Sequence, residues 1–243
     1  MSATLYTTYQ RCPQQALARV LGVYPEPSVA SFRGALAHRL FARHLSVGPI
    51  PDNDLPSACR EETGANLNGQ LAAIGLKPSE FRNIVSEVSE LYRRFSVVPM
   101  DDIVDAEVSF EDEVGDGIVL RGRIDAVFRD DAGVRIVDWK TGANLGDDVA
   151  AQLTFYAMAW EKRTGERPAT LEALSLKTGE RWSLQPSQAD VTTVEEAVVS
   201  MVVVLRRAIA AGSELERTAG PHCRWCPVLP DCSEGASAVA IAW

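Results

Sequence analysis

Residues 122–142 read GRIDAVFRDDAGVRIVDWKTG, and this stretch sets the interpretation of the whole chain. The runs 117–129 and 134–140 are rich in Val, Ile, Leu and Phe, which suit β-strands. Residues 130–133, Asp-Asp-Ala-Gly, form a polar cluster that ends in glycine, as the turn of a β-hairpin often does. The stretch therefore predicts two antiparallel strands joined by a tight turn.

Two aspartates and a lysine share one face of this hairpin. Side chains alternate between the faces of a strand, so Asp138 and Lys140 point one way and Trp139 the other. If the turn is centred on residues 131 and 132, paired residues have numbers that sum to 263, and Asp125 lies opposite Asp138 with Cβ atoms about 5 Å apart. Like charges at that distance are destabilising, so either a positive group lies between them or one of them is protonated, and a divalent metal ion is the simplest candidate. The alternative is that all three residues are solvated on the strand surface.

Length, charge and cysteine content narrow the class of protein. The chain of 243 residues has no glycine- or serine-rich linker, so we expect a single domain over residues 1–243. It has no apolar run of about eighteen residues and no secretory signal at its start, which favours a cytoplasmic protein without a membrane partner. Five cysteines then favour a metal or cluster site over disulfides. The net charge of −9 argues against nucleic-acid binding by bulk electrostatics, unless bound metal ions supply positive charge locally.

The order of the predicted elements indicates an α/β fold. Apolar residues recur at helical spacing in 31–45, 79–95 and 190–210, and another helix is expected over 147–163. Residues 103–110 are expected to form a strand before the hairpin, 170–186 two short strands after it, and 48–70 a loop with three prolines. We expect a mixed central sheet flanked by helices, with a helical part at 1–100, a catalytic sheet and helix at 101–186, and a C-terminal helix and cysteine region at 187–243. Asp147 is expected to cap the helix over 147–163, and Ile209 to lie on the buried face of the helix over 190–210. The chain contains no G-x-x-x-x-G-K-[ST] loop, so we expect no P-loop motor in it.

The hairpin resembles the central motif of the PD-(D/E)xK nuclease superfamily, specifically its RecB-like branch. The resemblance rests on Asp125 after Gly-Arg-Ile, on Asp138 and Lys140 within Ile-Val-Asp-Trp-Lys-Thr-Gly, and on Gln152 and Tyr156 in the following helix. It implies a restriction-endonuclease-like core in which Asp125, Asp138 and Lys140 are catalytic and Gln152 and Tyr156 bind the substrate. The helical pattern by itself also fits Tyr156 as an ordinary core residue, because it lies on an apolar stripe.

The same resemblance implies a set of metal ligands. His38 follows a glycine by four residues in the predicted helix 31–45, like the histidine that supplies a ligand in this family, although a lone histidine on a helix is more often packed or on the surface. With His38, the resemblance assigns Asp125, Asp138 and the backbone carbonyl of Trp139 to one or two Mg²⁺ or Mn²⁺ ions. The side chain of Trp139 replaces the usual tyrosine and is expected to face away from these ligands. Glu107 lies where the family places an accessory acid, and a solvated strand residue is an equal alternative there.

Four cysteines are candidates for a second metal centre. Cys223, Cys226 and Cys232 have C-x2-C-x5-C spacing, and Cys12 is expected near the start of a helix within residues 4–20. Four thiolates can hold a structural zinc, the commoner device, or a 4Fe-4S cluster, and His222 could replace one ligand of a zinc ion. One cysteine near one end of the core and three near the other resemble the iron-sulfur members of the RecB-like branch. The resemblance thus implies a 4Fe-4S cluster that joins the two ends of the chain.

The implied activity is that of a metal-dependent DNA exonuclease acting on single strands or DNA ends. The implied settings are recombination or repair with a separate helicase, and CRISPR spacer acquisition with adaptation proteins. Two other classes stay open: a catalytically silent DNA-binding or assembly subunit with the same fold, and a zinc-stapled interaction module. Intact Asp125, Asp138 and Lys140 favour the enzyme, because a silent subunit would normally have lost one of them.

Overall fold

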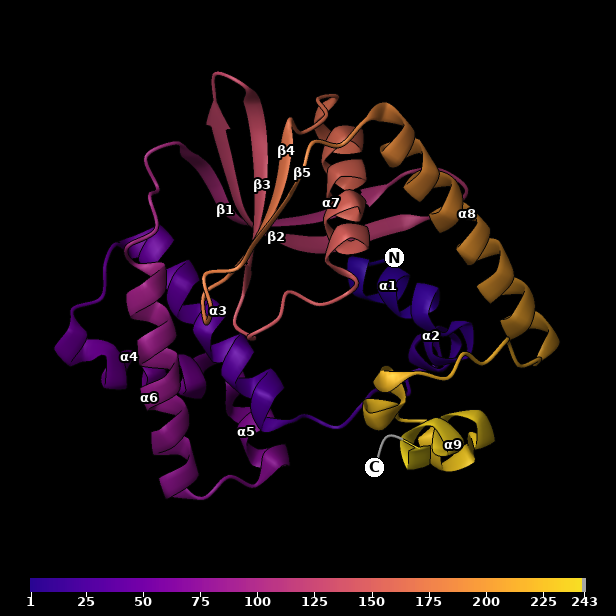
Figure 1. Ribbon diagram of the computed structural model, residues 1–243, viewed down its shortest axis with the longest axis horizontal. Coiled ribbons are helices and arrows are strands. Elements are labelled where there is room, and N and C mark those ends of the chain that lie inside the picture. Colours follow the sequence, from indigo (N-terminus) through magenta and orange to yellow (C-terminus); the bar gives the residue numbers. More distant parts are fainter. Residues whose placement is uncertain (242–243) are drawn as a thin grey trace.

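The computed structural model describes residues 1–241 and contains a five-stranded sheet packed between helices (Figure 1). The strands are β1 (Ile103–Glu113), β2 (Val119–Asp130), β3 (Gly133–Lys140), β4 (Thr170–Ser175) and β5 (Arg181–Leu184). The α-helices are α1 (Ala3–Arg11), α2 (Pro13–Val20), α3 (Val29–Val47), α4 (Leu55–Glu62), α5 (Asn68–Ile74), α6 (Pro78–Phe95), α7 (Val149–Thr164), α8 (Gln188–Ala211) and α9 (Ser233–Ile241). The strands lie in the order β1-β2-β3-β4-β5, with β3 and β4 parallel and the other neighbours antiparallel. The predicted α/β fold with a mixed sheet is confirmed.

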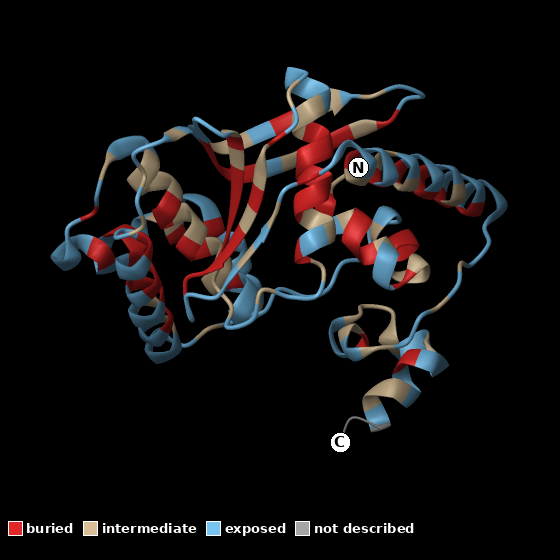
Figure 2. Ribbon diagram, turned by 45° about the horizontal axis from the view of Figure 1, so that its top comes forward, coloured by how far each residue is buried: buried red, intermediate tan, exposed pale blue. Residues whose placement is uncertain are grey.

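Each face of the sheet packs against its own group of helices. Helices α1, α7 and α8 pack with Val134 and Ile136 of β3 in one core. Helices α3, α4 and α6 pack with Val137 and Trp139 of the same strand in the other core. Because successive side chains of β3 enter opposite cores, the strand is buried on both sides. Figure 2 shows much of α7 as buried, which places this helix firmly against the sheet.

The hairpin of β2 and β3 has the register that the sequence predicts. Its turn consists of residues 131–132, and paired residues such as Ala126 and Val137 have numbers that sum to 263. The next position in this register brings Asp125 and Asp138 opposite each other. The two aspartates thus lie at the open end of the paired region, where a third group can approach them.

Residues 48–70 are mostly helical, so the prediction of a loop was wrong. They include the whole of α4, a π-helical turn (Thr63–Leu67) and the start of α5. Leu55, Ala58 and Cys59 recur at helical spacing and are buried with α3 and α6. Pro56 lies in the first turn of α4, where proline costs no backbone hydrogen bond. The segment therefore contains a short run of apolar residues at helical spacing among its prolines and polar residues.

The helix expected within residues 4–20 is divided in two. Helix α1 ends at Arg11 and α2 begins at Pro13, while Cys12 between them has an extended backbone with φ −157° and ψ 106°. A proline disfavours helical geometry at the residue before it, which explains the break. Cys12 therefore lies at the start of a helix as expected, but the residues before it form a second helix that the sequence analysis did not anticipate.

Two details at helix boundaries also differ from the predictions. The N-cap of α7 is Asp148 and not Asp147, and the side chain of Asp148 makes no capping hydrogen bond. Ile209, expected on the buried face of α8, is 44% exposed because it lies near the end of that helix, beyond most of the core. No helix within residues 1–241 is long and apolar enough to cross a membrane.

Candidate active site

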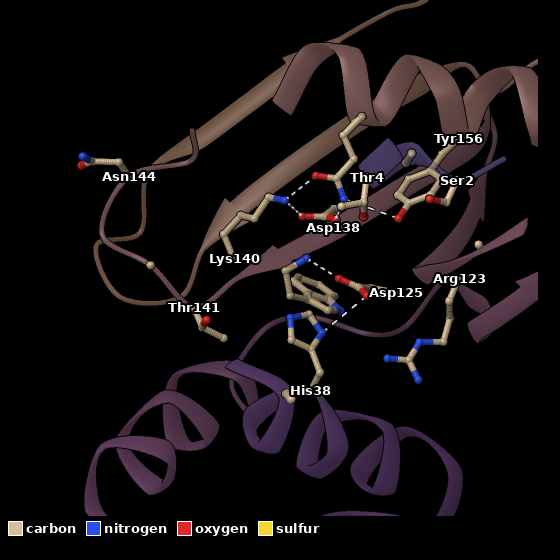
Figure 3. A pocket seen from close by; sticks show the side chains of 16 residues that line it. Ser2, Thr4, His38, Arg123, Asp125, Asp138, Lys140, Thr141, Asn144 and Tyr156 are labelled. Atoms are coloured by element: carbon tan, nitrogen blue, oxygen red, sulfur yellow. Dashed lines mark hydrogen bonds and ion pairs between the residues drawn. The ribbon is translucent and has the colours of Figure 1, made fainter. Parts of the chain in front are cut away.

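The side chains that the sequence singled out meet in one cavity of about 450 Å³ at the end of β3 (Figure 3). Its polar lining comes from β2, β3, α7, α3 and the start of α1, which contribute Asp125, Asp138, Lys140, Gln152, Tyr156, His38, Ser2 and Thr4. His38 approaches the aspartates from α3, on the side opposite α7 (Figure 3). Helices from both faces of the sheet thus converge on the end of the hairpin.

Three acidic residues lie in a row across β1, β2 and β3. The residues on either side of Glu107 pair with those on either side of Asp125, and Asp138 follows on the next strand. Glu107 has a left-handed backbone with φ +53°, which is uncommon outside glycine and costs on the order of 1–3 kcal/mol. Strain of this size persists where the surrounding structure holds it, and here it directs the glutamate side chain toward Asp125.

His38, Glu107 and Asp125 form a group that could hold a metal ion. Ligand atoms from the three residues all lie within 4.8 Å of one another, and His38 Nδ1 is 3.5 Å from Asp125 Oδ1. Carboxylate oxygens suit Mg²⁺, and a mixture of oxygen and imidazole nitrogen suits Mn²⁺. The structure thus brings Glu107, which the sequence left undecided, into this group. Asp138 lies outside it.

Burial and neighbouring charges shift the pKa values of this group. Burial alone would lower the pKa of His38, but the Asp125 carboxylate facing it raises that pKa to about 8. Burial would raise the pKa of Asp125, yet His38 and the backbone amide of Trp139 hold it below its ordinary value. Burial raises the pKa of Glu107 against the opposing effect of Arg123. The protonated imidazole therefore balances Asp125, and a divalent cation bound at this place would have to displace its proton.

Gln152 connects the aspartate and the lysine of β3. Its Oε1 accepts a hydrogen bond of 2.6 Å from Lys140 Nζ, and its Nε2 donates one of 2.9 Å to Asp138 Oδ1. Lys140 Nζ also lies 2.9 Å from Asp138 Oδ2, so the three side chains form a closed ring of polar contacts (Figure 3). The Tyr156 hydroxyl lies 3.4 Å from Gln152 Nε2, at the edge of this ring. We refer to Asp138, Lys140 and Gln152 as the β3–α7 clamp.

Asp138 is poised between two protonation states. Burial and the nearby Asp125 raise its pKa to about 6, although Lys140 opposes this shift. Burial also raises the pKa of Tyr156, so its hydroxyl stays protonated at neutral pH. A buried carboxylate with such a pKa gains from a proton or from a cation nearby. The row of acids is therefore a site at which positive charge is favoured.

The absence of a side chain at Gly34 lets α3 approach the end of β3. A Cβ at this position would lie 3.3 Å from Thr141 Oγ1, closer than most side-chain carbons come to a neighbour. His38 follows four residues later, on the same face of the helix. Gly34 and His38 thus act together: the glycine lets α3 lie close to the end of β3, and the histidine extends from the same helix.

Trp139 points away from the cavity, as the alternation of side chains predicts. Its indole is buried in the core formed with α3, α4 and α6, and it packs edge-on against Phe95 and Phe128. Its backbone amide donates a 2.9 Å hydrogen bond to Asp125 Oδ2. The replacement of tyrosine by tryptophan therefore leaves the cavity unchanged. The role of the Trp139 carbonyl as a metal ligand stays a prediction.

Arg123 also lines the cavity, although it was not among the site residues expected from the sequence. Its Nε lies 2.7 Å from Glu107 Oε2. The available signal was its position two residues before Asp125 on β2, which places both side chains on one face. The arginine therefore holds one oxygen of Glu107 and leaves the other oxygen for a different partner.

Cys12, Cys223, Cys226 and Cys232 line a small cavity at the C-terminal end of the structure. The backbone N–H of Gly220 donates to Cys223 Sγ at 3.4 Å, and that of Gly235 donates to Cys232 Sγ at 3.3 Å. A Cβ at Gly235 would lie 3.3 Å from the sulfur of Cys232 and 3.4 Å from that of Cys223, so a side chain there would intrude between them. Cys59 is buried elsewhere, in the core beside α3.

A sequence model of the PD-(D/E)XK nuclease superfamily matches residues 1–233. None of the curated proteins matches the sequence. Among solved structures, the chain is similar to a candidate exonuclease from Eubacterium rectale, with 14% identity over 89% of this chain and 84% of that one and a TM-score of 0.49. It is also similar to SSO0001, with 16% identity over 83% and 96% of the two chains and a TM-score of 0.41. VC1899 from Vibrio cholerae gives 16% identity over 84% and 63%, with a TM-score of 0.27. These structural likenesses are distant, and the assignment rests on the family match, which spans nearly the whole sequence. The chain belongs to the PD-(D/E)XK nuclease superfamily.

Proposed function

We propose that the protein is a metal-dependent deoxyribonuclease of the RecB-like branch. The observation that carries this proposal is the convergence of His38, Glu107 and Asp125 beside the β3–α7 clamp. This arrangement provides ligands for a divalent cation next to a lysine with a fixed ammonium group. Both groups assist hydrolysis of a phosphodiester bond, because negative charge develops on the phosphate oxygens during the reaction.

The residues of the cavity fit a hard divalent cation. They combine carboxylates that disfavour one another with an imidazole that can release its proton, and the raised pKa of Asp138 reflects the need for positive charge. Asp125, Asp138, His38, Glu107 and the carbonyl of Trp139 would hold one or two Mg²⁺ or Mn²⁺ ions. Such an ion, when bound, polarises the phosphate and lowers the pKa of a nearby water molecule.

The protein's own side chains supply the orientation. Lys140, held by Asp138 and Gln152, directs its ammonium group at the attacking water or at the developing phosphate charge. The contacts of Gln152 suggest that it acts first on the lysine and the aspartate, and Tyr156 would place its hydroxyl against the nucleic-acid strand beside them. Helices α1, α3 and α7 form walls of the cavity around the end of β3.

The substrate that we propose is single-stranded DNA or a frayed DNA end, degraded by an exonuclease. The volume of the cavity, about 450 Å³, lies in the range of small-ligand sites and suits a nucleotide unit of a single strand. The chain has no nucleotide-driven motor motif, so recombination or repair would require a separate helicase. CRISPR spacer acquisition with adaptation proteins is the other setting that the RecB-like resemblance supports.

Digestion of end-labelled oligonucleotides tests this function. We expect cleavage of single strands with Mn²⁺ or Mg²⁺, its loss with chelator, and its loss in the Asp138→Ala variant. Single-nucleotide steps from one labelled end would identify an exonuclease. Binding of the oligonucleotide without cleavage under any metal condition would instead favour the catalytically silent subunit, and fully active Asp138→Ala protein would exclude the proposed site.

We also propose that the four cysteines of the C-terminal cavity hold a 4Fe-4S cluster. Their convergence, the two N–H···S hydrogen bonds and the space left by Gly235 support a centre with four thiolate ligands. Protein purified without oxygen is expected to absorb broadly in the visible range and to contain iron and sulfide. Cys12→Ser should lose the iron, whereas the control Cys59→Ser should retain it. Zinc without iron would establish the zinc-stapled alternative.

A further inference from the structure

A second cavity, of about 460 Å³, adjoins the active site. Thr141 lines both cavities. The second cavity lies between α3, α6 and the turn that connects β4 and β5, and four cations line it together with two acids: Arg33, Arg93, Arg94, Lys177, Glu87 and Glu90. Its lining is thus positive in a chain whose net charge is −9. We call it the basic groove.

The cations of the groove differ in how far they are neutralised. Arg33 lies 2.7 Å from Glu87, and Arg94 Nε lies 3.1 Å from Glu90. Arg93 pairs with Asp52 outside the groove at 2.6 Å and with Glu90 inside it at 3.5 Å. Lys177 is exposed, and its ammonium group has no hydrogen bond or ion pair with any residue in the described range 1–241. Lys177 therefore provides the one uncompensated cation in this part of the lining.

The position of Lys177 is fixed relative to the catalytic strand. Leu176, the residue before it, donates from its amide to the Lys140 carbonyl at 2.8 Å. On the other side of the turn, Thr178 Oγ1 donates to the carbonyl of Ala143 at 3.1 Å. Arg94 holds the turn from α6 by donating to the Lys177 carbonyl. Figure 1 shows the turn between β4 and β5 extending toward α3, beside the segment that follows β3.

We propose that the basic groove is a phosphate-binding subsite for the nucleic-acid strand that occupies the active site. In this arrangement the strand passes from Lys140 over Thr141, and Lys177 binds a backbone phosphate other than the scissile one. A compact ammonium group on a rigid turn suits a contact to the phosphate backbone without base recognition. This inference rests on the proposed nuclease function. It adds to that function the path of the strand outside the catalytic cavity.

The binding test uses the full chain with the Asp138→Asn substitution and with chelator, so that the strand is bound but not cleaved. Anisotropy of a labelled single strand of about ten nucleotides measures the dissociation constant as a function of salt. One phosphate contact to a single strand contributes about 0.7 to the salt slope, so Lys177→Ala is expected to weaken binding about eightfold at about 50 mM salt and about threefold at about 200 mM. Lys77→Ala is the matched control, because that lysine is exposed at the opposite end of α6. An unchanged affinity and salt slope in Lys177→Ala would overturn the subsite.

The cleavage test compares two substrates in the otherwise unaltered protein. A dinucleotide contains only the scissile phosphate, whereas a longer oligonucleotide also reaches the groove. We expect Lys177→Ala to lower kcat/KM for the oligonucleotide by about eightfold relative to the dinucleotide at low salt, and Lys177→Arg to restore most of it. An equal loss with both substrates would place Lys177 in the catalytic centre and overturn the proposal. Wild-type protein that cleaves neither substrate would refute the nuclease function alone, since the binding test stands without cleavage.

Discussion

The β3–α7 clamp predicts how strongly activity depends on Gln152. Replacement by leucine keeps a side chain of similar size but removes the acceptor for Lys140 and the donor to Asp138. A hydrogen bond to a charged group is worth about 1.5–3 kcal/mol. Because the contact of 2.9 Å between Lys140 and Asp138 remains, we count the net loss as one such bond. That loss corresponds to a fall in kcat of about 10- to 150-fold.

Initial rates on an end-labelled single strand, measured over a range of substrate concentrations, separate kcat from KM. The loss should fall mainly on kcat, because the contacts that Gln152 makes are to the catalytic residues. The acidic limb of the kcat profile should also move to higher pH, since a donor to the Asp138 carboxylate favours its ionised form. Tyr156→Phe is the contrasting variant, because it removes only a hydroxyl 3.4 Å from the amide. Since that hydroxyl is proposed to contact the strand, we expect its loss to raise KM and to change kcat by less than about threefold.

Two results would refute this reasoning. One is a Gln152→Leu enzyme whose kcat stays within about threefold of wild type. The other is a variant in which KM alone rises, which would make Gln152 a substrate contact and not part of a clamp. The melting temperature of each variant, measured in the assay buffer, separates a loss of catalysis from a loss of folded protein.

Three further predictions concern the acids and α3. Gly34→Ala places a Cβ 3.3 Å from Thr141 Oγ1 and moves His38 outward, so calorimetry should show about three- to tenfold weaker Mn²⁺ binding; unchanged affinity would contradict the close approach. The pKa of His38 is raised from 6.5 to about 8, so in metal-free protein the stability that it contributes is complete below pH 6.5 and is lost as pH rises through about 8. Denaturant unfolding of wild type and His38→Gln should therefore differ by up to about 2 kcal/mol near pH 6 and converge near pH 9, and a constant difference would disprove the coupling to Asp125. Asp138→Asn removes a carboxylate whose pKa is raised to about 6, so the variant should be inactive with metal present and, without metal, should melt no lower than wild type above that pH; a lower melting temperature would argue against the like-charge cost.

The hairpin could be predicted from the sequence down to its register, because local rules determine it. Strand alternation fixes which residues share a face, and a turn of residues 131–132 fixes which residues pair. The opposition of Asp125 and Asp138 followed from these two rules. The helical spacing of Gln152 and Tyr156 was equally local, and it placed both side chains in the cavity.

The rest depends on contacts between distant segments. Glu107 joins His38 and Asp125 only because its backbone takes a left-handed conformation within β1, which no periodic pattern encodes. The partners of Gln152 depend on how α7 packs over β3, and the basic groove depends on the turn that holds Lys177. The helical character of residues 48–70 was hidden because prolines near a helix start look the same in sequence as prolines in a loop.

Helix α1 connects the wall of the active-site cavity to the wall of the cysteine cavity. Its first turn carries Thr4 in the wall of the active-site cavity, and Cys12 follows its last residue in the wall of the cysteine cavity. Nine helical residues span only about 13 Å, and a helix that short moves as a rigid rod. We expect a displacement of Cys12 along the axis of α1 to reach the catalytic wall through this helix. Loss of the cysteine site should consequently be detectable as altered geometry at the metal-binding end, even though no side chain of the two sites touches the other.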